Sequence, residues 1–214
     1  MTKQNKGLKK LLLIGGGGHC RSCIEVIRSQ NEWQIAGIVE SDSVQQPTAS
    51  LGVAVVGRDS DLPQLLKQTP YGLITVGQVK SANLRKQLFE KLQTLGMQFP
   101  VIVSSSAYVS SMAQLGKGTI VMHQALVNVQ AQIGQNCIIN SQALIEHDVV
   151  IGHHTHISTA AKVNGGVQIG EGCLIGSGSI IKQGVRIGDH VIIGAGSLVL
   201  KDILQAGIYT GVIK

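Results

Sequence analysis

The second half of this chain repeats with a period of six residues. From Val109 to Leu204, sixteen consecutive hexads each begin with Leu, Ile or Val, and no insertion interrupts them. The fifth position of the hexad is mostly small or β-branched, and Gly often takes the second position. A period of six matches neither the 3.6-residue period of a helix nor the alternation of a long strand. It is typical of a parallel β-helix, in which each hexad supplies one short strand and a turn.

Three hexads are expected to form one triangular coil, so that residues 18 positions apart stack on one another. The first-position aliphatic residue should point inward, with the fifth-position residue packed beside it, and Gly should serve the turns. No single coil can bury its own core, but about five stacked coils can. A Val- and Ile-rich β-sandwich is the alternative, but it would show turn signals every 8–12 residues without a fixed phase.

The first half of the chain shows a different pattern. Strand-like apolar runs alternate with helix-like segments, which predicts a small parallel α/β unit. The expected strands cover residues 10–14, 34–39, 53–56, 71–76 and 99–103, and the expected helices cover residues 21–29, 60–68 and 81–95. Small residues at 104–107 mark a boundary. The sequence therefore predicts two domains, an α/β, Rossmann-like domain at 1–103 and a β-helix at 104–214.

The charge of the chain excludes some classes of partner. The formal net charge is +6, and most of the excess lies in residues 1–100, which hold 12 Lys or Arg residues against 7 Asp or Glu residues. A nucleic-acid-binding surface would need a basic stripe with interleaved aromatic residues, whereas aromatic residues make up only 3% of the chain. We therefore expect no nucleic-acid partner, while a small phosphate-bearing molecule is compatible with the charge.

The cysteines and the apolar segments favour a cytoplasmic setting. No run of 18 apolar residues is present, so no membrane span is expected, and the apolar run at 11–14 is too short for a signal peptide. Cys137 and Cys173 occupy one column two coils apart, too far to form a disulfide. Cys20 and Cys23 form a C-x-x-C without the second pair that a zinc site would need. This usage of cysteine favours a reducing compartment.

A glycine-rich loop separates the first predicted strand from the first predicted helix. The loop consists of Gly15, Gly16, Gly17 and Gly18, and it is followed by His19. Backbone N–H groups at the start of a helix favour an anion, although a plain tight turn would also use glycine. The loop is therefore a candidate phosphate-binding site.

Two acidic residues follow the second predicted strand, where such a fold binds a ribose or a base. They are Glu40 and Asp42. The third glycine of the dinucleotide fingerprint is replaced by Cys20, and the domain is short for a full dinucleotide fold. Together these features predict a nucleotide diphosphate as the ligand rather than NAD.

One face of the predicted coils lacks the usual glycine of the second hexad position. Its second-position column holds Asn128, Glu146, Asn164 and Lys182, and its third-position column holds Val129, His147, Gly165 and Gln183. A departure from the structural consensus toward polar groups marks a candidate site. Within it, Glu146 and Asp148 flank His147, and Gly165 on the next coil should leave open space beside the imidazole.

This acidic–histidine–acidic triplet has the composition of a general-base site. A carboxylate bonded to one ring nitrogen of His147 would fix its tautomer and raise the basicity of the other nitrogen. Side chains alternate in direction along a strand, so the turn geometry decides whether Glu146 or Asp148 reaches the imidazole. An ordinary solvent-facing histidine is the alternative. We predict His147 as a general base, with Glu146 and Asp148 as candidate partners.

The glycine loop, the E-H-D triplet and the V-I-G-x-x-x-H-I-S segment at 150–158 resemble one family of sugar acetyltransferases. These enzymes join a small nucleotide-binding domain to a left-handed parallel β-helix of hexapeptide repeats. They include the UDP-4-amino-sugar N-acetyltransferases of bacillosamine synthesis, perosamine N-acetyltransferases and sialic-acid O-acetyltransferases. The resemblance covers nearly the whole chain. It implies acetyl-CoA as co-substrate and a homotrimer with active sites between neighbouring subunits.

The resemblance also implies roles for single residues. It implies that His147 is the general base and that an adjacent acid, for which we favour Asp148, orients it. His156 matches a family histidine near the acetyl-CoA thioester, and Asn140 matches a polar residue near the reacting sugar. The nucleotide is implied to lie on the glycine loop and on the acidic segment after the second strand.

Glycines of the upper coils complete the predicted acetyl-CoA site. A backbone N–H near Gly165 and Gly166 is the expected donor to the oxyanion. Gly176, Gly194 and Ala195 keep one edge of the coils flat, where a pantetheine arm can lie, although turn requirements explain them equally well.

No metal is expected in the coils, although three histidines lie close together in the sequence. His153, His154 and His156 lack the closed ligand set of a structural zinc site, and the first two are expected on the surface. Two features depart from the family: the chain ends in Gly-Val-Ile-Lys at 211–214 without the usual proline, and Cys20 replaces a glycine.

The sequence therefore predicts an acetyl-CoA-dependent N-acetyltransferase. Its expected acceptor is the 4-amino group of a nucleotide-linked amino-dideoxy sugar, as in a UDP-bacillosamine-type pathway. O-acetylation of a sialic-acid-type sugar is the alternative within the enzyme class. A non-catalytic β-helix protein that binds nucleotide sugars is the alternative of another class.

Overall fold

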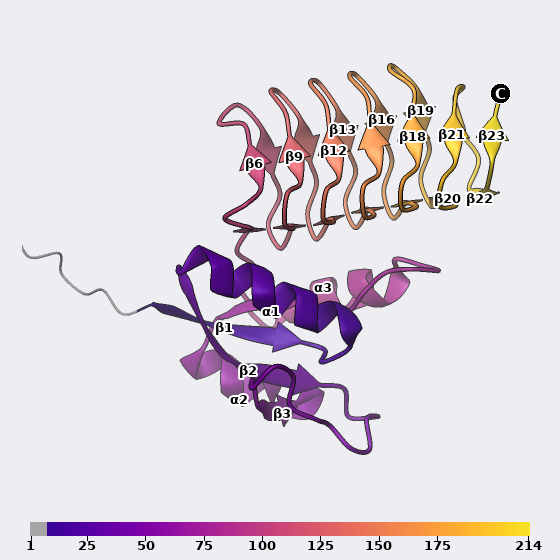
Figure 1. Cartoon of the computed structure of the whole chain (residues 1–214). Coiled ribbons are helices and arrows are strands. Elements are labelled where there is room, and N and C mark those ends of the chain that lie inside the picture. Colours follow the sequence, from indigo (N-terminus) through magenta and orange to yellow (C-terminus); the bar gives the residue numbers. More distant parts are fainter. Residues whose placement is uncertain (1–7) are drawn as a thin grey trace, which may run out of the picture.

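A computed structural model describes residues 8–214 of the chain. Two parts follow one another in the sequence, an N-terminal α/β domain and a stack of coils (Figure 1). The predicted fold class, an α/β domain followed by a parallel β-helix, is confirmed. None of the described helices is both long and apolar enough to cross a membrane.

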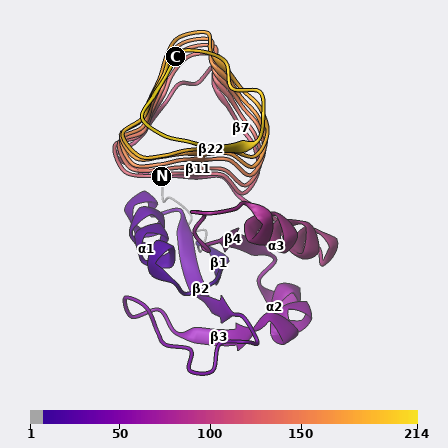
Figure 2. The same ribbon diagram turned by 90° about the vertical axis from the view of Figure 1, so that its right-hand side faces the viewer.

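The N-terminal domain is built on a four-stranded parallel sheet in the order β3-β2-β1-β4. The strands are β1 (Lys9–Ile14), β2 (Trp33–Glu40), β3 (Val55–Arg58) and β4 (Tyr71–Ile74), and a 3-10 helix covers Asp59–Asp61. Helix α1 (Gly18–Gln30) lies on one face, and α2 (Leu62–Gln68) and α3 (Asn83–Thr94) lie on the other (Figure 2). The strand order reverses between β1 and β4, so the loops after these two strands flank the crevice where such sheets bind ligands.

The coils form a triangular prism with three parallel sheets (Figure 2). Sheet 1 contains β5 (Ile102–Val103), β8 (Ile120–Val121), β11 (Ile138–Ile139), β14 (His156–Ile157), β17 (Leu174–Ile175), β20 (Val191–Ile193) and β22 (Gly207–Tyr209). Sheet 2 contains β6 (Tyr108–Val109), β9 (Leu126–Val127), β12 (Leu144–Ile145), β15 (Lys162–Val163), β18 (Ile180–Ile181), β21 (Leu198–Val199) and β23 (Val212–Ile213). Sheet 3 contains β7 (Gln114–Leu115), β10 (Gln132–Ile133), β13 (Val150–Ile151), β16 (Gln168–Ile169) and β19 (Arg186–Ile187). We name the three edges of the prism corner 1/2, corner 2/3 and corner 3/1 after the sheets that meet there.

The predicted stacking of residues 18 positions apart is confirmed, as in the pairing of Ile133 with Ile151. First- and fifth-position side chains fill the interior, and Cys137 is fully buried there. The turn geometry has two separate requirements. Second-position glycines allow close approach of the coils, since a Cβ on Gly152 would lie 2.6 Å from the backbone N of Glu171. Fourth-position residues adopt left-handed backbone angles, as Asp148 does with φ of 60°.

The strand expected at residues 99–103 lies elsewhere than predicted. Residues 102–103 form β5, which pairs with β8 of sheet 1 and not with the N-terminal sheet. The first coil therefore begins two residues before the predicted boundary, and the division at 103/104 stays a prediction. At the other end, β22 and β23 pair with the preceding coil although the chain lacks the expected proline.

A buried arginine of α3 joins the N-terminal domain to the coils. Arg85 is 1% exposed. Its Nη1 donates to the carbonyl oxygens of Ile74 and Val76 at 3.0 and 2.6 Å, and its Nη2 donates to Oδ1 of Asn136 at 2.7 Å. Burial lowers the pKa of Arg85 to about 10. Because Asn136 lies at corner 3/1, this contact holds the end of β4 against sheet 1.

Candidate active site

The glycine loop lies where β1 ends and α1 begins, beside the loop that follows β4. Thr75, at the end of β4, donates from its hydroxyl to the carbonyl oxygen of Gly15 at 2.6 Å. Gly17 is the N-cap of α1 and no side chain caps this helix. A Cβ added to Gly17 or Gly18 would meet no atom within 4 Å. The start of α1 is therefore open to a phosphate, which its N–H groups can bind.

The acidic residues after β2 lie at the same end of the sheet, but they already have partners. Glu40 accepts a hydrogen bond from the backbone N of Gly16 at 2.9 Å, and a Cβ on Gly16 would lie 2.2 Å from that carboxylate oxygen. Asp42 accepts from the hydroxyl of Ser60 at 2.9 Å. Glu40 thus holds the loop in shape. Cys20 is fully buried in the domain core, so its thiol does not crowd the loop.

His19, in the first turn of α1, is enclosed between the domains. Burial, together with the positive charge of Arg85, lowers the pKa of His19 to about 3. Its Nε2 is buried and has no hydrogen-bond partner among the described residues. His19 is therefore a neutral imidazole at neutral pH, placed between the glycine loop and the coils.

The predicted pair of His147 and an acid is present at corner 2/3. Nδ1 of His147 donates to Oδ2 of Asp148 at 2.8 Å, and both side chains are about half exposed. The left-handed backbone of Asp148 turns its carboxylate toward the imidazole. Glu146 instead accepts from Nδ2 of Asn128 at 2.8 Å. Because Nδ1 carries the proton in this bond, Nε2 of His147 presents a lone pair.

Gly165 leaves the space that the imidazole occupies. A Cβ on Gly165 would lie 2.6 Å from both Cε1 and Nε2 of His147, so this position requires glycine for the ring to lie there. The neighbouring Gly166 donates its N–H to the carbonyl oxygen of His147 at 2.9 Å. That N–H is therefore already bonded, and Gly166 does not offer it to an oxyanion.

His156 lies on β14 of sheet 1, against the loop that follows β4. Its Nδ1 donates to the carbonyl oxygen of Gln78 at 2.8 Å, and its Nε2 accepts from the amide of Asn140 at 3.1 Å. Burial lowers the pKa of His156 to about 4. The side chain is therefore neutral at neutral pH, and its tautomer is fixed by these two bonds.

A cavity of about 440 Å³ opens beside His156, and we call it the corner cavity. It follows corner 1/2 toward the C-terminus and brings together most of the residues predicted for acetyl-CoA. Its walls include His156, Ser158, Gly176, Ser177, Gly194 and Ala195. Gly165 and Gly166, which were predicted for the same ligand, lie at corner 2/3 beside His147 and not in this cavity.

Within one chain, the two halves of the predicted site face different directions. The N-terminal domain covers sheet 1 (Figure 2). His156 of this sheet bonds to Gln78 in the loop after β4 and to Asn140 in the turn at corner 1/2. His147 lies in the turn between β12 and β13, at the corner opposite sheet 1. One chain therefore does not bring His147 to its own corner cavity.

The prediction from the sequence missed or misplaced several residues at this site. His154 was expected on the surface but is 6% exposed, with its ring edge-on to Phe89 of α3, and burial lowers its pKa to about 4. Gln78 and Arg85 were not singled out at all.

No three His, Cys, Asp or Glu side chains within residues 8–214 are arranged to hold a metal ion.

Burial also determines the state of the coil cysteines. Cys137 and Cys173 point inward as predicted, and burial raises the pKa of each thiol to about 11. Neither is a thiolate at neutral pH, so neither is suited to act as a nucleophile.

Two family descriptions match separate parts of the chain. Residues 10–92 match the PglD N-terminal domain, and residues 166–201 match the bacterial transferase hexapeptide of six repeats. UDP-N-acetylbacillosamine N-acetyltransferase of Bacillus subtilis (strain 168) is 32% identical over 116 residues. That match covers 54% of this chain and 52% of the relative, so it spans about half of either protein.

Solved structures match over nearly the full length. PerB from Caulobacter crescentus, in complex with CoA and GDP-perosamine, is 34% identical with a TM-score of 0.88, covering 96% of this chain and 95% of that one. The acetyltransferase domain of PglB from Neisseria gonorrhoeae FA1090, in complex with acetyl coenzyme A, is 30% identical with a TM-score of 0.87. The match covers 96% of this chain and 97% of that one.

Proposed function

This chain belongs to the sugar acetyltransferases in which a PglD-type domain precedes a left-handed β-helix of hexapeptide repeats, and we propose that it acetylates the 4-amino group of a nucleotide-linked amino-dideoxy sugar. The donor is acetyl-CoA. The observation that carries the proposal is the bond between His147 and Asp148 at an exposed corner, with Gly165 leaving room for the ring. A surface histidine with no catalytic role would not require a carboxylate that fixes its tautomer or a glycine on the next coil that makes room for its ring.

His147 acts as the general base. As the sugar amine attacks the thioester carbonyl, Nε2 of His147 takes the proton from the amine, and the C–N bond forms. The C–S bond then breaks and the sulfur of CoA leaves as the free thiol, taking the proton from the His147 imidazolium and returning the imidazole to its neutral form. Asp148 stabilises the imidazolium that forms in between. No acyl-enzyme is required, in keeping with the buried, protonated state of the coil cysteines.

The other residues bind and orient the two substrates. The pantetheine arm of acetyl-CoA lies in the corner cavity along Gly176, Gly194 and Ala195, with the thioester beside His156. His156 is neutral and fully bonded, so it serves as a fixed wall and not as an acid or base. The pyrophosphate of the nucleotide sugar binds at the open start of α1, which places the sugar near Asn140.

A second copy of the chain supplies the base. Since His147 lies at the corner opposite sheet 1, the amine of a sugar held by one chain meets His147 of a neighbour. A closed ring of three copies gives each site the same pair of surfaces. The proposal therefore includes a homotrimer with its sites between subunits.

A CoA-release assay tests this function directly. Acetyl-CoA is offered with a UDP-linked 4-amino-4,6-dideoxy sugar, its GDP-linked counterpart, or free sialic acid. Turnover with one nucleotide-linked amino sugar supports the proposal and identifies the nucleotide. Turnover with sialic acid alone would assign O-acetylation and leave the glycine loop a structural turn. Binding of a nucleotide sugar without CoA release in any arm would indicate the non-catalytic alternative.

A further inference from the structure

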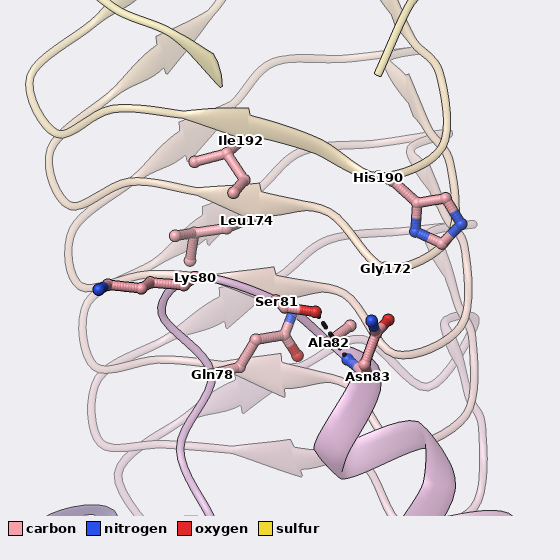
Figure 3. A pocket seen from close by; sticks show the side chains of 9 residues that line it. All are labelled: Gln78, Lys80, Ser81, Ala82, Asn83, Gly172, Leu174, His190 and Ile192. Carbon is pink, nitrogen blue, oxygen red and sulfur yellow. Dashed lines mark hydrogen bonds between the residues drawn. The ribbon is translucent and has the colours of Figure 1, made fainter. Parts of the chain in front are cut away.

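The corner cavity is bounded on one side by a wall that it shares with a second cavity. The second cavity, of about 310 Å³, lies toward the N-terminus of α3 (Figure 3). Three residues, Gln78, Leu174 and Ile192, line both cavities. The two spaces are therefore neighbours that meet at these three residues.

Leu174 and Ile192 form a common apolar floor. They are paired on β17 and β20 of sheet 1. The next residues along these strands, Ile175 and Ile193, point into the coil interior, so Leu174 and Ile192 point outward toward the N-terminal domain. An apolar chain lying on them meets no polar group of the floor between the two cavities.

Gln78 lies at the margin of this floor, next to Leu174, where both cavities reach it (Figure 3). It is 3% exposed, and its Nε2 donates to the carbonyl oxygen of Cys173 at 3.0 Å. Its Oε1 is buried and has no hydrogen-bond partner among the described residues. The bond to His156 comes from the main-chain oxygen of Gln78 and not from its side chain. A shorter side chain would therefore leave that bond in place.

We propose that Gln78 sets the length of the acyl group that this enzyme transfers. The inference rests on the proposed function, in which the thioester lies beside His156 in the corner cavity. An acetyl group ends before Gln78, whereas a longer chain following the floor of Leu174 and Ile192 meets the Gln78 side chain. The reaction is the same for any acyl group, since a C–S bond is exchanged for a C–N bond.

Shortening Gln78 should join the two cavities without unfolding the chain. In Gln78→Ala, the carbonyl oxygen of Cys173 keeps a donor, because the backbone N of His156 also bonds to it at 2.9 Å. The buried oxygen that lacks a partner leaves together with the side chain, so no new unpaired group is created. Gln78→Met keeps the length of the side chain but removes its hydrogen bond, and it is the matched control.

The test compares kcat/KM for butyryl-CoA and acetyl-CoA with the same amino-sugar acceptor. We expect the butyryl-to-acetyl ratio to rise about tenfold or more in Gln78→Ala, because added methylene groups are rejected by factors of this size when a pocket ends early. Gln78→Ser should show a similar rise. Gln78→Met should keep the ratio of the unsubstituted enzyme.

An unchanged ratio in both Gln78→Ala and Gln78→Ser, with acetyl turnover still present, would overturn the inference. An equal rise in Gln78→Met would do so as well, since the effect would then not come from space. The acetyl rate of the unsubstituted enzyme distinguishes a failure of the acyl-length role from a failure of the proposed function. If that rate is zero, the proposed function fails and the acyl-length role falls with it.

Discussion

At the scale of single residues, the backbone angle of Asp148 decides which carboxylate serves His147. Asp148 occupies the fourth hexad position, where the corner imposes a φ of 60°, and this bend brings its oxygen to 2.8 Å from Nδ1. Glu146 directly precedes the histidine but points to Asn128 on the previous coil. The hydrogen-bonded pair therefore depends on the turn of the coil as much as on the residue types.

His147→Ala should lower kcat by about 10²- to 10⁴-fold, the range expected when a general base is removed. Asp148→Asn should cause a smaller loss, because Asn tolerates the left-handed angle but cannot stabilise an imidazolium by charge. Steady-state kinetics with the best acceptor from the CoA-release assay measure both effects. His153→Ala, at an exposed histidine outside the proposed site, is the control and should keep its activity. Full activity of His147→Ala would exclude this residue as the base.

At the scale of elements, the start of α1 offers a test of the phosphate site. Gly17→Asp places a carboxylate at an uncapped helix start with open space around it, and Asp is a favourable N-cap residue. The variant should be as stable as the parent or more so, while the KM for the nucleotide sugar rises about tenfold or more through repulsion of the phosphates. Thermal melting and KM are measured together.

Gly17→Ala is the neutral control for this substitution. It adds a methyl group in the same open space without charge, so its KM should change far less than that of Gly17→Asp. If both variants retain the parent's KM, the nucleotide does not bind at the start of α1. If both variants lose affinity equally, the loop requires glycine itself, and repulsion between the added carboxylate and the phosphates is not the cause of the loss.

The elements themselves were largely predictable, whereas the contacts between them were not. The hexad period predicted the coils because residues 18 positions apart must pack on each other. The run of glycines predicted the loop after the first strand. The repeat carries no information on what covers sheet 1, so His154 was placed on the surface although α3 buries it. In sequence, Arg85 looks like any charged residue of an exposed helix, yet it is 1% exposed.

At the scale of the whole molecule, the two domains are joined through neutral histidines. His19, His154 and His156 lie between the domain and the coils, and burial lowers their pKa values to about 3, 4 and 4. The unfolded chain binds protons at these residues below about pH 6.5, whereas the folded chain does not. Their contribution to stability is therefore complete above pH 6.5 and is lost as the pH falls toward 4.

We expect unfolding near pH 5 to take up about three protons through these residues. The free energy of unfolding in urea, measured from pH 7.5 to 5, should fall with the corresponding slope. His154→Gln, which can still accept from Asn136, should reduce the uptake by about one proton, and His153→Gln serves as its control. The same slope in the parent and in His154→Gln would contradict the neutral state of His154.

Because each proposed site is built from two chains, two different defective variants should restore activity to each other when they assemble in one trimer. In an assay with the nucleotide sugar well below its KM, His147→Ala should be nearly inactive because the base is missing, and Gly17→Asp should keep about a tenth of the parent activity or less because binding is weakened. In trimers that mix both chains at random, about a quarter of the sites combine an intact His147 with an intact loop. Co-expressed, co-purified variants should therefore recover about a quarter of the parent activity. Recovery no greater than the sum of the separate variants would place each site within one chain.

The left-handed corners leave this molecule room for gains in stability. Eight corner positions between Gln124 and His190 carry residues other than glycine at positive φ, and each such residue costs about 1 kcal/mol relative to glycine in that conformation. Gln130 and Ala160 are two of them, and neither belongs to the proposed site. Substitution by glycine at those corners is therefore a route to a more stable protein that leaves the proposed site at His147 and Asp148 unchanged.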